Sequence, residues 1–244
     1  MTGPTCFSTA GDLAGLTWPE VPADALLVVP VGSVEQHGPH LPLDTDARVA
    51  SAVARELVRT TAGAVLAPAV PYGASGEHES FPGTISIGTE ALRTLLVELG
   101  RSACRWAPRL VLVNGHGGNA QALVQAVRLL RQESRDVAWL PCAVPASAAH
   151  VPDAHAGRTE TSLLLALHPA DVRTAVAAAG ATAPVATLMP ALRAGGVRAV
   201  SANGVLGDPA GAHTAEGEQL LAALAEQAAG AVRRWAPDTN GMLS

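Results

Sequence analysis

Five side chains able to bind a metal ion fall within twelve residues near the N-terminus. They are Glu35, His37, His40, Asp44 and Asp46, and they follow an apolar run that predicts a buried strand. In extended backbone, side chains two residues apart point to the same side, so Glu35 and His37 are expected to do so. Carboxylate oxygens and imidazole nitrogens are the donors that Zn, Mn and Fe(II) accept. The segment therefore predicts part of a metal site at the end of a strand.

A glycine-rich turn over residues 114–119 supplies another candidate ligand, His116. The turn directly follows an apolar stretch that predicts a second strand, and its glycines let the backbone approach a ligand closely. Ligands of open α/β sheets bind outside the carboxyl ends of the strands, so His116 is expected beside Glu35 and Asp46. The alternative is a module that binds phosphate or carboxylate through backbone N–H groups, with no chemistry. A histidine inside the turn fits metal ligation better.

A third cluster lies around residues 153–162. Glu160 lies at the start of an otherwise apolar helix. It is a candidate metal ligand and catalytic group; the alternative is a first-turn glutamate that only stabilises the helix. His155 is the candidate proton carrier, because the ordinary pKa of histidine is about 6.5. Glu77 and His78, in a polar loop, are candidates for lining the pocket or contacting the substrate.

Strands and helices alternate along the part of the chain that carries these residues. The pattern predicts an α/β fold, with a parallel sheet covered by helices on both faces. No linker divides the chain, so we expect an N-terminal arm over residues 1–22 and one domain over residues 23–244. Apolar runs predict strands over 25–31, 65–67, 109–113 and 137–140, and helical spacing predicts helices over 46–59, 89–106, 120–132, 159–167, 183–194 and 214–235.

The composition excludes several classes of function. All 16 basic residues are arginine, which excludes a lysine Schiff base, and the net charge of -5 argues against a nucleic-acid partner. The three cysteines form no CxxC pair and are typical of a reduced, cytoplasmic protein. We expect no signal peptide and no membrane span, because no apolar run approaches about 20 residues.

Residues 32–46, 114–119 and 155–162 resemble the three signatures of the creatininase (creatinine amidohydrolase) family. The resemblance implies a three-layer α/β/α domain, a centre of two divalent ions (Zn, Fe(II) or Mn) and a homo-oligomer. It places one ion on Glu35, Asp46 and His116, and the other on His37, Asp46 and Glu160. Such ions would make hydroxide available at neutral pH and polarise an amide carbonyl, while His155 passes the proton to the leaving amine. His40 is a candidate for holding a ligand carboxylate in place.

Further stretches resemble the mycofactocin-system branch of this family. They lie at residues 71–79, 86–93, 204–209 and 240–243. This resemblance implies a peptidase that releases a modified Val-Tyr unit from the end of a ribosomal precursor peptide. The alternatives inside the family are hydrolysis of a small cyclic amide or of a formamide. Creatininases carry a glutamate two residues after the histidine that matches His116; this chain has Gly118 there, and Glu160 is the expected substitute.

Overall fold

Four parallel strands form the centre of the molecule. The computed structural model describes residues 11–144 and 153–244. The strands are β1 (Leu26–Val31), β2 (Ala64–Leu66), β3 (Arg109–Asn114) and β4 (Val137–Pro141), in the spatial order β2-β1-β3-β4. Every residue of β1 is buried. A continuous apolar strand is what a parallel sheet requires when both of its faces are covered.

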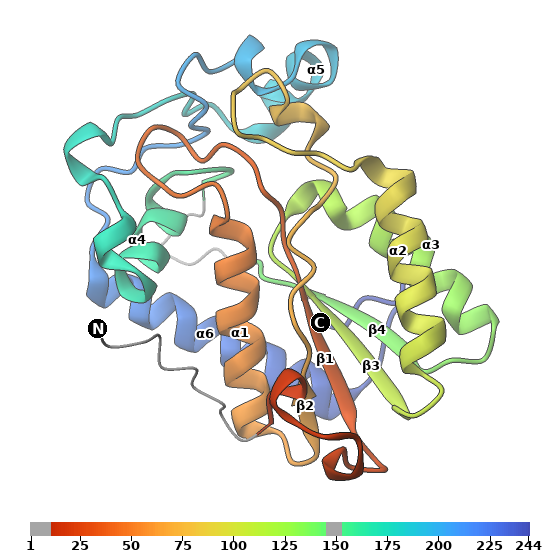
Figure 1. The fold of residues 1–244 in the computed structure, drawn as a ribbon. Helices are drawn as coiled ribbons and strands as arrows, with labels where there is room; N and C mark the ends of the chain where they lie inside the picture. The colour runs from red at the N-terminus through yellow and green to blue at the C-terminus, as the bar shows by residue number, and fades with distance from the viewer. Residues whose placement is uncertain (1–10, 145–152) are drawn as a thin grey trace, which may run out of the picture.

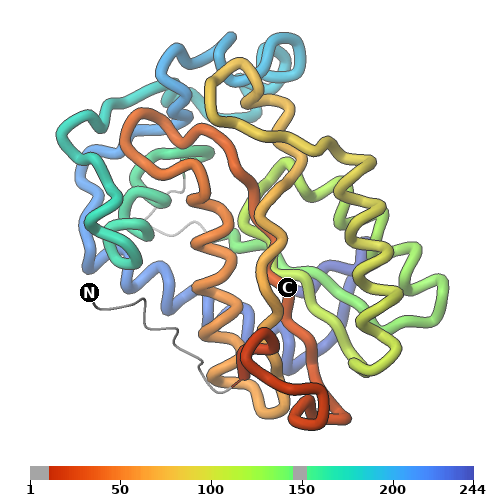
Figure 2. Tube along the Cα trace, in the orientation of Figure 1, coloured from red at the N-terminus to blue at the C-terminus, as the bar shows by residue number. Residues whose placement is uncertain are grey.

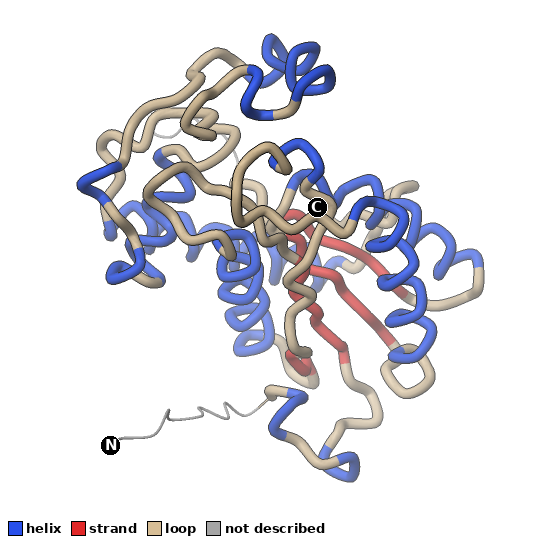
Figure 3. Tube along the Cα trace, turned by 45° about the horizontal axis from the view of Figure 1, so that its top comes forward, coloured by secondary structure: helices blue, strands red, loops and turns tan. Residues whose placement is uncertain are grey.

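Helices cover both faces of this sheet (Figure 1). Successive side chains of β1 enter opposite cores: Leu26 and Val28 face α1, α4 and α6, whereas Leu27 and Val29 face α2 and α3. The predicted three-layer α/β/α class is therefore confirmed, and Figure 3 shows the strands between the two helical layers. The helices are α1 (Thr45–Thr60), α2 (Gly88–Ala103), α3 (Ala120–Gln132), α4 (Arg158–Leu167), α5 (Val185–Gly195) and α6 (Thr214–Arg234).

One prediction about an element end needs correction. The helix predicted over 89–106 ends at Ala103, because residues 104–106 form a turn in which the Cys104 N–H bonds to the carbonyls of Gly100 and Ser102. The described part of the N-terminal arm is attached to the sheet, since the Leu66 N–H donates to the Gly11 carbonyl. Residues 1–10 of that arm, with Cys6, lie outside the described residues. None of the helices in the described ranges is long and apolar enough to cross a membrane.

The carboxyl ends of β1 and β3 lie side by side, because Val31 pairs with Asn114 in register. The first turn of α1 packs directly onto these two ends. A Cβ atom at Gly32 would lie 2.4 Å from the Ala47 Cα, and one at Gly115 would lie 2.3 Å from the Asp46 carbonyl oxygen. Only glycine allows this approach. The packing brings Asp46, in the first turn of α1, next to the loops that follow the two strands. Figure 2 traces the chain from β1 through the following loop into α1.

Candidate metal centre

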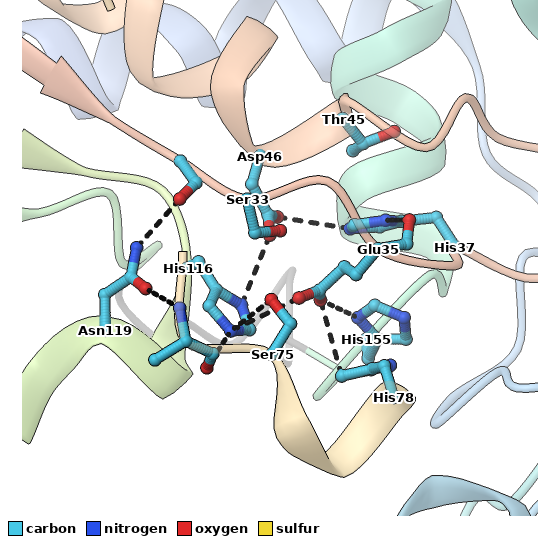
Figure 4. A network of polar contacts seen from close by, with 12 residues as sticks. Ser33, Glu35, His37, Thr45, Asp46, Ser75, His78, His116, Asn119 and His155 are labelled. Atoms are coloured by element: carbon cyan, nitrogen blue, oxygen red, sulfur yellow. Dashed lines mark hydrogen bonds and ion pairs between the residues drawn. The ribbon is translucent and has the colours of Figure 1, made fainter. Parts of the chain in front are cut away.

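Three predicted ligands meet at the carboxyl end of the sheet: Glu35, Asp46 and His116. All are buried, and their ligand atoms lie within 4.8 Å of one another. The His116 ring lies between the two carboxylates, with Nδ1 3.2 Å from Asp46 Oδ2 and Nε2 3.2 Å from Glu35 Oε2 (Figure 4). Ser33 donates its hydroxyl to Asp46 Oδ2 at 2.7 Å and so fixes the rotation of that carboxylate.

His37 and Glu160 lie on the other side of Asp46. The Nδ1–H of His37 donates to the Glu35 carbonyl oxygen at 3.2 Å, since that oxygen can only accept. The other ring nitrogen, Nε2, then faces Asp46 Oδ1 at 3.1 Å and Glu160 Oε2 at 3.9 Å. A bare nitrogen aimed at two carboxylates requires a cation between them, either a proton or a metal ion. The backbone hydrogen bond on the far nitrogen is typical of histidines that bind metals.

Glu35 provides the test of whether this cluster fits a metal. Its side chain is fully buried, yet neither carboxylate oxygen has a hydrogen-bond partner among the described residues. A buried carboxylate without hydrogen bonds costs several kcal/mol, on the order of the penalty for moving an ion out of water. A divalent cation would supply the missing partner, and the surrounding set of carboxylate and imidazole donors suits Zn, Fe(II) or Mn.

The pKa values of the cluster show the same demand for a cation. Burial, and then the charge of Asp46, raises the pKa of Glu35 to about 7, and burial raises the pKa of Glu160 to about 7. Burial alone would lower the pKa of His37, but Asp46 outweighs it and raises the pKa to about 10. Glu35 and Asp46 likewise overcome burial at His116, whose pKa rises to about 9. Without metal, protons therefore take the place of the ions.

Gln36 arranges two further histidines at this centre. Its side-chain Oε1 accepts from the Gly38 N–H at 2.9 Å, so its Nε2 faces His78 Nδ1 at 2.8 Å. His78 then carries its proton on Nε2, which lies 3.3 Å from Glu35 Oε1 but makes no hydrogen bond to it. His155 Nε2 must donate to the Gln36 backbone carbonyl at 2.8 Å, which leaves His155 Nδ1 without a proton. That nitrogen lies 3.7 Å from Glu35 Oε1.

His155 lies closer to the ligands than a remote proton carrier would. Its ligand atom groups with those of His37 and Glu160, and also with those of Glu35 and His78. Burial, together with the charges of His37 and His78, lowers its pKa well below the ordinary value. His155 is therefore neutral at neutral pH, and it can accept a proton through Nδ1.

The prediction for His40 needs correction. This fully buried ring contacts the Thr161 hydroxyl through Nε2 at 2.9 Å, and among the described residues it holds no ligand carboxylate. It thus supports the first turn of α4, next to Glu160.

Glu160, the expected substitute for the glutamate missing at Gly118, reaches the centre from another direction. Glu160 lies beside His37, whereas the three atoms nearest to a Cβ built at Gly118 belong to Ala74, His116 and Glu77.

The sequence patterns did not single out the residues that join the loops of the site to one another. Asn119 accepts from the Ala74 N–H at 2.9 Å and donates to the Gly32 carbonyl at 2.9 Å, so it links the polar loop to the end of β1. Gln36 joins His78 to the first motif. Both residues lie inside the motifs at 32–46 and 114–119. Their position next to predicted ligands could have identified them as part of the site.

Comparisons with known proteins show which proteins this chain is similar to. A mycofactocin precursor peptide peptidase of Mycolicibacterium smegmatis is 57% identical over 224 residues, covering 90% of this chain and 89% of that protein. A protein of the same name from Mycobacterium tuberculosis is 53% identical over 96% of this chain and 95% of its own length. Among solved structures, a variant creatininase of Zn-Zn type has a TM-score of 0.78 at 28% identity, covering 95% of this chain and 100% of that one.

The family model described as creatinine amidohydrolase matches residues 14–232, nearly the whole described chain. The match spans all three motifs and the loop that carries Glu77 and His78. The chain belongs to the creatininase family.

Proposed function

We propose that this protein is a metal-dependent peptidase that releases the modified Val-Tyr unit from the carboxy end of the mycofactocin precursor peptide. The observation that carries the hydrolase part is the buried cluster around Glu35, whose carboxylate has no hydrogen bond within the described part of the chain. The choice of a peptide substrate is supported by relatives of that name at 53–57% identity. It rests on that likeness and not on the metal cluster, which other hydrolases of amide bonds also need.

The residues suit two divalent ions. Glu35, Asp46 and His116 would hold one, and His37, Asp46 and Glu160 the other, with Asp46 shared between them. When bound, such ions lower the pKa of water to about 7 and withdraw electrons from the scissile carbonyl. The mixed nitrogen and oxygen donors suit Zn, Fe(II) and Mn.

His155 moves the proton in this proposal. Its Nε2–H is held by the Gln36 carbonyl, so Nδ1 is the atom that accepts a proton and then donates it to the leaving amine. Its lowered pKa keeps it neutral before the reaction, as an acceptor must be. Buried neighbours hold the ring in one orientation, which positions the nitrogen before the substrate arrives.

The cluster argues against the alternative of a simple anion-binding turn. His116 projects from that turn toward Glu35 and Asp46, and Glu77 lies 3.7 Å from its Nε2. A phosphate bound there would meet these carboxylates at short range, and like charges repel most strongly in a buried site. The turn is therefore better suited to hold a cation than an anion.

The test is mass spectrometry of a modified, Val-Tyr-ended precursor peptide after incubation with the protein. Metal-loaded protein is expected to release the carboxy-terminal unit, whereas chelator-stripped protein is not, and adding Zn²⁺ back is expected to restore release. Absence of cleavage by protein shown to contain metal would contradict the peptide substrate. A small cyclic amide or a formamide would then be assayed with the same preparation.

Three expectations remain part of the proposal. They are a reduced cytoplasmic location, a homo-oligomer and a single domain that begins at residue 23.

A further inference from the structure

The loop between β2 and α2 brings an additional carboxylate to the centre. The turn at Gly76–His78 directs Glu77 toward His116, with 3.7 Å between Glu77 Oε1 and His116 Nε2. His78 from the same turn contacts Glu35. The Glu77 side chain is 37% exposed, so it lies at the border between the buried ligands and solvent. The ligand sets assigned above leave Glu77 without a role.

Oxygen atoms crowd around a single nitrogen at this place. His116 Nε2 lies 3.2 Å from Glu35 Oε2, 3.2 Å from the Ala74 carbonyl oxygen and 3.7 Å from Glu77 Oε1. One N–H cannot satisfy three acceptors with good geometry. Glu35 is fully buried, and neither of its oxygens has a hydrogen-bond partner among the described residues. A cation beside His116 would satisfy the acceptors that the single N–H leaves over. Glu77 lies outside the groups whose ligand atoms are within 4.8 Å of one another, so its partly exposed side chain would turn further inward to bind that cation.

Gly118 shows that this carboxylate occupies space that a side chain would otherwise fill. A Cβ built at Gly118 would lie 2.7 Å from Glu77 Oε1, 2.4 Å from His116 Nε2 and 2.4 Å from the Ala74 carbonyl oxygen. Real Cβ atoms do not approach other atoms so closely. A side chain at position 118 and the observed position of Glu77 therefore exclude each other. The pocket beside His116 thus receives its second carboxylate from the polar loop, 41 positions earlier in the chain.

We propose that Glu77 is a further ligand of the ion held by Glu35, Asp46 and His116. This inference rests on the metal-dependent part of the proposed function and names the ligand that completes one of its two ions. Glu77 would bind this ion from the solvent-facing side of the site, whereas the buried Glu35 and Asp46 would bind it from the protein interior. The position of Glu77 then depends on the packing of its turn. A Cβ at Gly196 would lie 2.6 Å from the Glu77 carbonyl oxygen, so the segment after α5 supports the turn.

The experiment compares Glu77→Gln with Glu79→Gln, an exposed glutamate two residues further along the same loop. Each variant is stripped with chelator, reloaded with Zn²⁺, and assayed for bound Zn²⁺ per chain and for affinity by chelator competition. Glu77→Gln is expected to weaken one of the two ions at least about tenfold, and Glu79→Gln to match the wild type. With Co²⁺ in place of Zn²⁺, the visible spectrum of Glu77→Gln is expected to change, because it reports the coordination shell.

Wild-type Zn²⁺ affinity and an unchanged Co²⁺ spectrum in Glu77→Gln would overturn the assignment. Circular dichroism of the metal-free variants separates loss of a ligand from loss of the fold, and Glu77→Asp, which keeps the charge, is expected to fall between the two glutamine variants. Metal binding is measured without any peptide. Failure of wild-type protein to cleave the precursor would therefore count against the proposed function and leave the ligand assignment standing.

Discussion

The two sides of the metal centre are built in different ways. Glu35, Asp46 and His116 come from the ends of β1 and β3 and the first turn of α1, and they are at most 6% exposed. Glu77 and Glu160 come from the polar loop and the start of α4, and their side chains are 37% and 24% exposed. The sheet thus fixes the inner ligands, while the outer ones depend on how loops pack. Substitutions of inner ligands should therefore abolish metal binding, whereas substitutions on the outer side should change metal affinity or rate by smaller factors.

The largest effect is expected on the inner side. Glu35→Gln should lose metal and reduce kcat/KM by more than about a thousandfold, because it removes the charge that an ion needs at the centre. The fold should persist, since the neutral amide replaces a carboxyl group that burial already drives toward neutrality, with a pKa raised to about 7. Metal analysis measures the loss of the ions, peptide cleavage measures the fall in kcat/KM, and thermal unfolding of the metal-free protein checks that the fold persists. A variant that keeps both ions would show that Glu35 is not an inner ligand.

His155→Ala should separate catalysis from metal binding. We expect both ions to stay and kcat to fall by about 10²–10⁴-fold, the usual contribution of a positioned proton carrier. A variant that loses an ion together with its rate would instead make His155 a ligand, as its proximity to His37 and Glu160 allows. His213→Ala is the matched control, because this side chain accepts from the Glu216 N–H at the start of α6 and belongs to none of the ligand groups among the described residues.

Proton competition should make metal affinity depend on pH. In the metal-free protein the pKa values of Glu35 and Glu160 are raised to about 7, that of His116 to about 9 and that of His37 to about 10. All four hold protons below these values and must release them to bind an ion, so affinity should rise with pH from about 6 to about 10. Calorimetry in buffers of different ionisation enthalpy would detect the released protons. An affinity that falls over this range would contradict the proposed ligand set.

The smallest effect is expected for Gln36→Met. The backbone carbonyl that orients His155 remains in this variant. The side-chain hydrogen bonds to His78, Gly38 and the Gly204 carbonyl are lost, together with the 3.0 Å contact between Gln36 Nε2 and His155 Nε2. We expect less than about a tenfold fall in kcat with unchanged metal content. A fall as large as that of His155→Ala would show that the side chain, and not the carbonyl, positions the proton carrier.

These two sides also differ in how well sequence predicts them. The inner ligands lie in continuous motifs after apolar strands, and the pairing of Val31 with Asn114 follows from the parallel sheet. The proximity of Glu77 to Gly118 could not be predicted, because 41 positions separate them and no periodic pattern relates a loop to a turn. Hydrogen bonds of Asn119 and Gln36 between loops likewise depend on packing. The end of α2 was predicted three residues too late because the apolar pattern continues into the following turn.

The contact between α1 and the two strand ends has a consequence for mutational tolerance. Gly32 and Gly115 have no unusual backbone angles, so each could adopt its conformation with any side chain. What excludes a side chain is the first turn of α1, 2.3–2.4 Å from the position of its Cβ. An alanine at either site would lift Asp46 away from the other ligands. In a saturation library selected for activity, Gly32 and Gly115 would therefore tolerate as few substitutions as the catalytic residues, although neither has a reactive side chain. In the same library selected for folding alone, they would tolerate more.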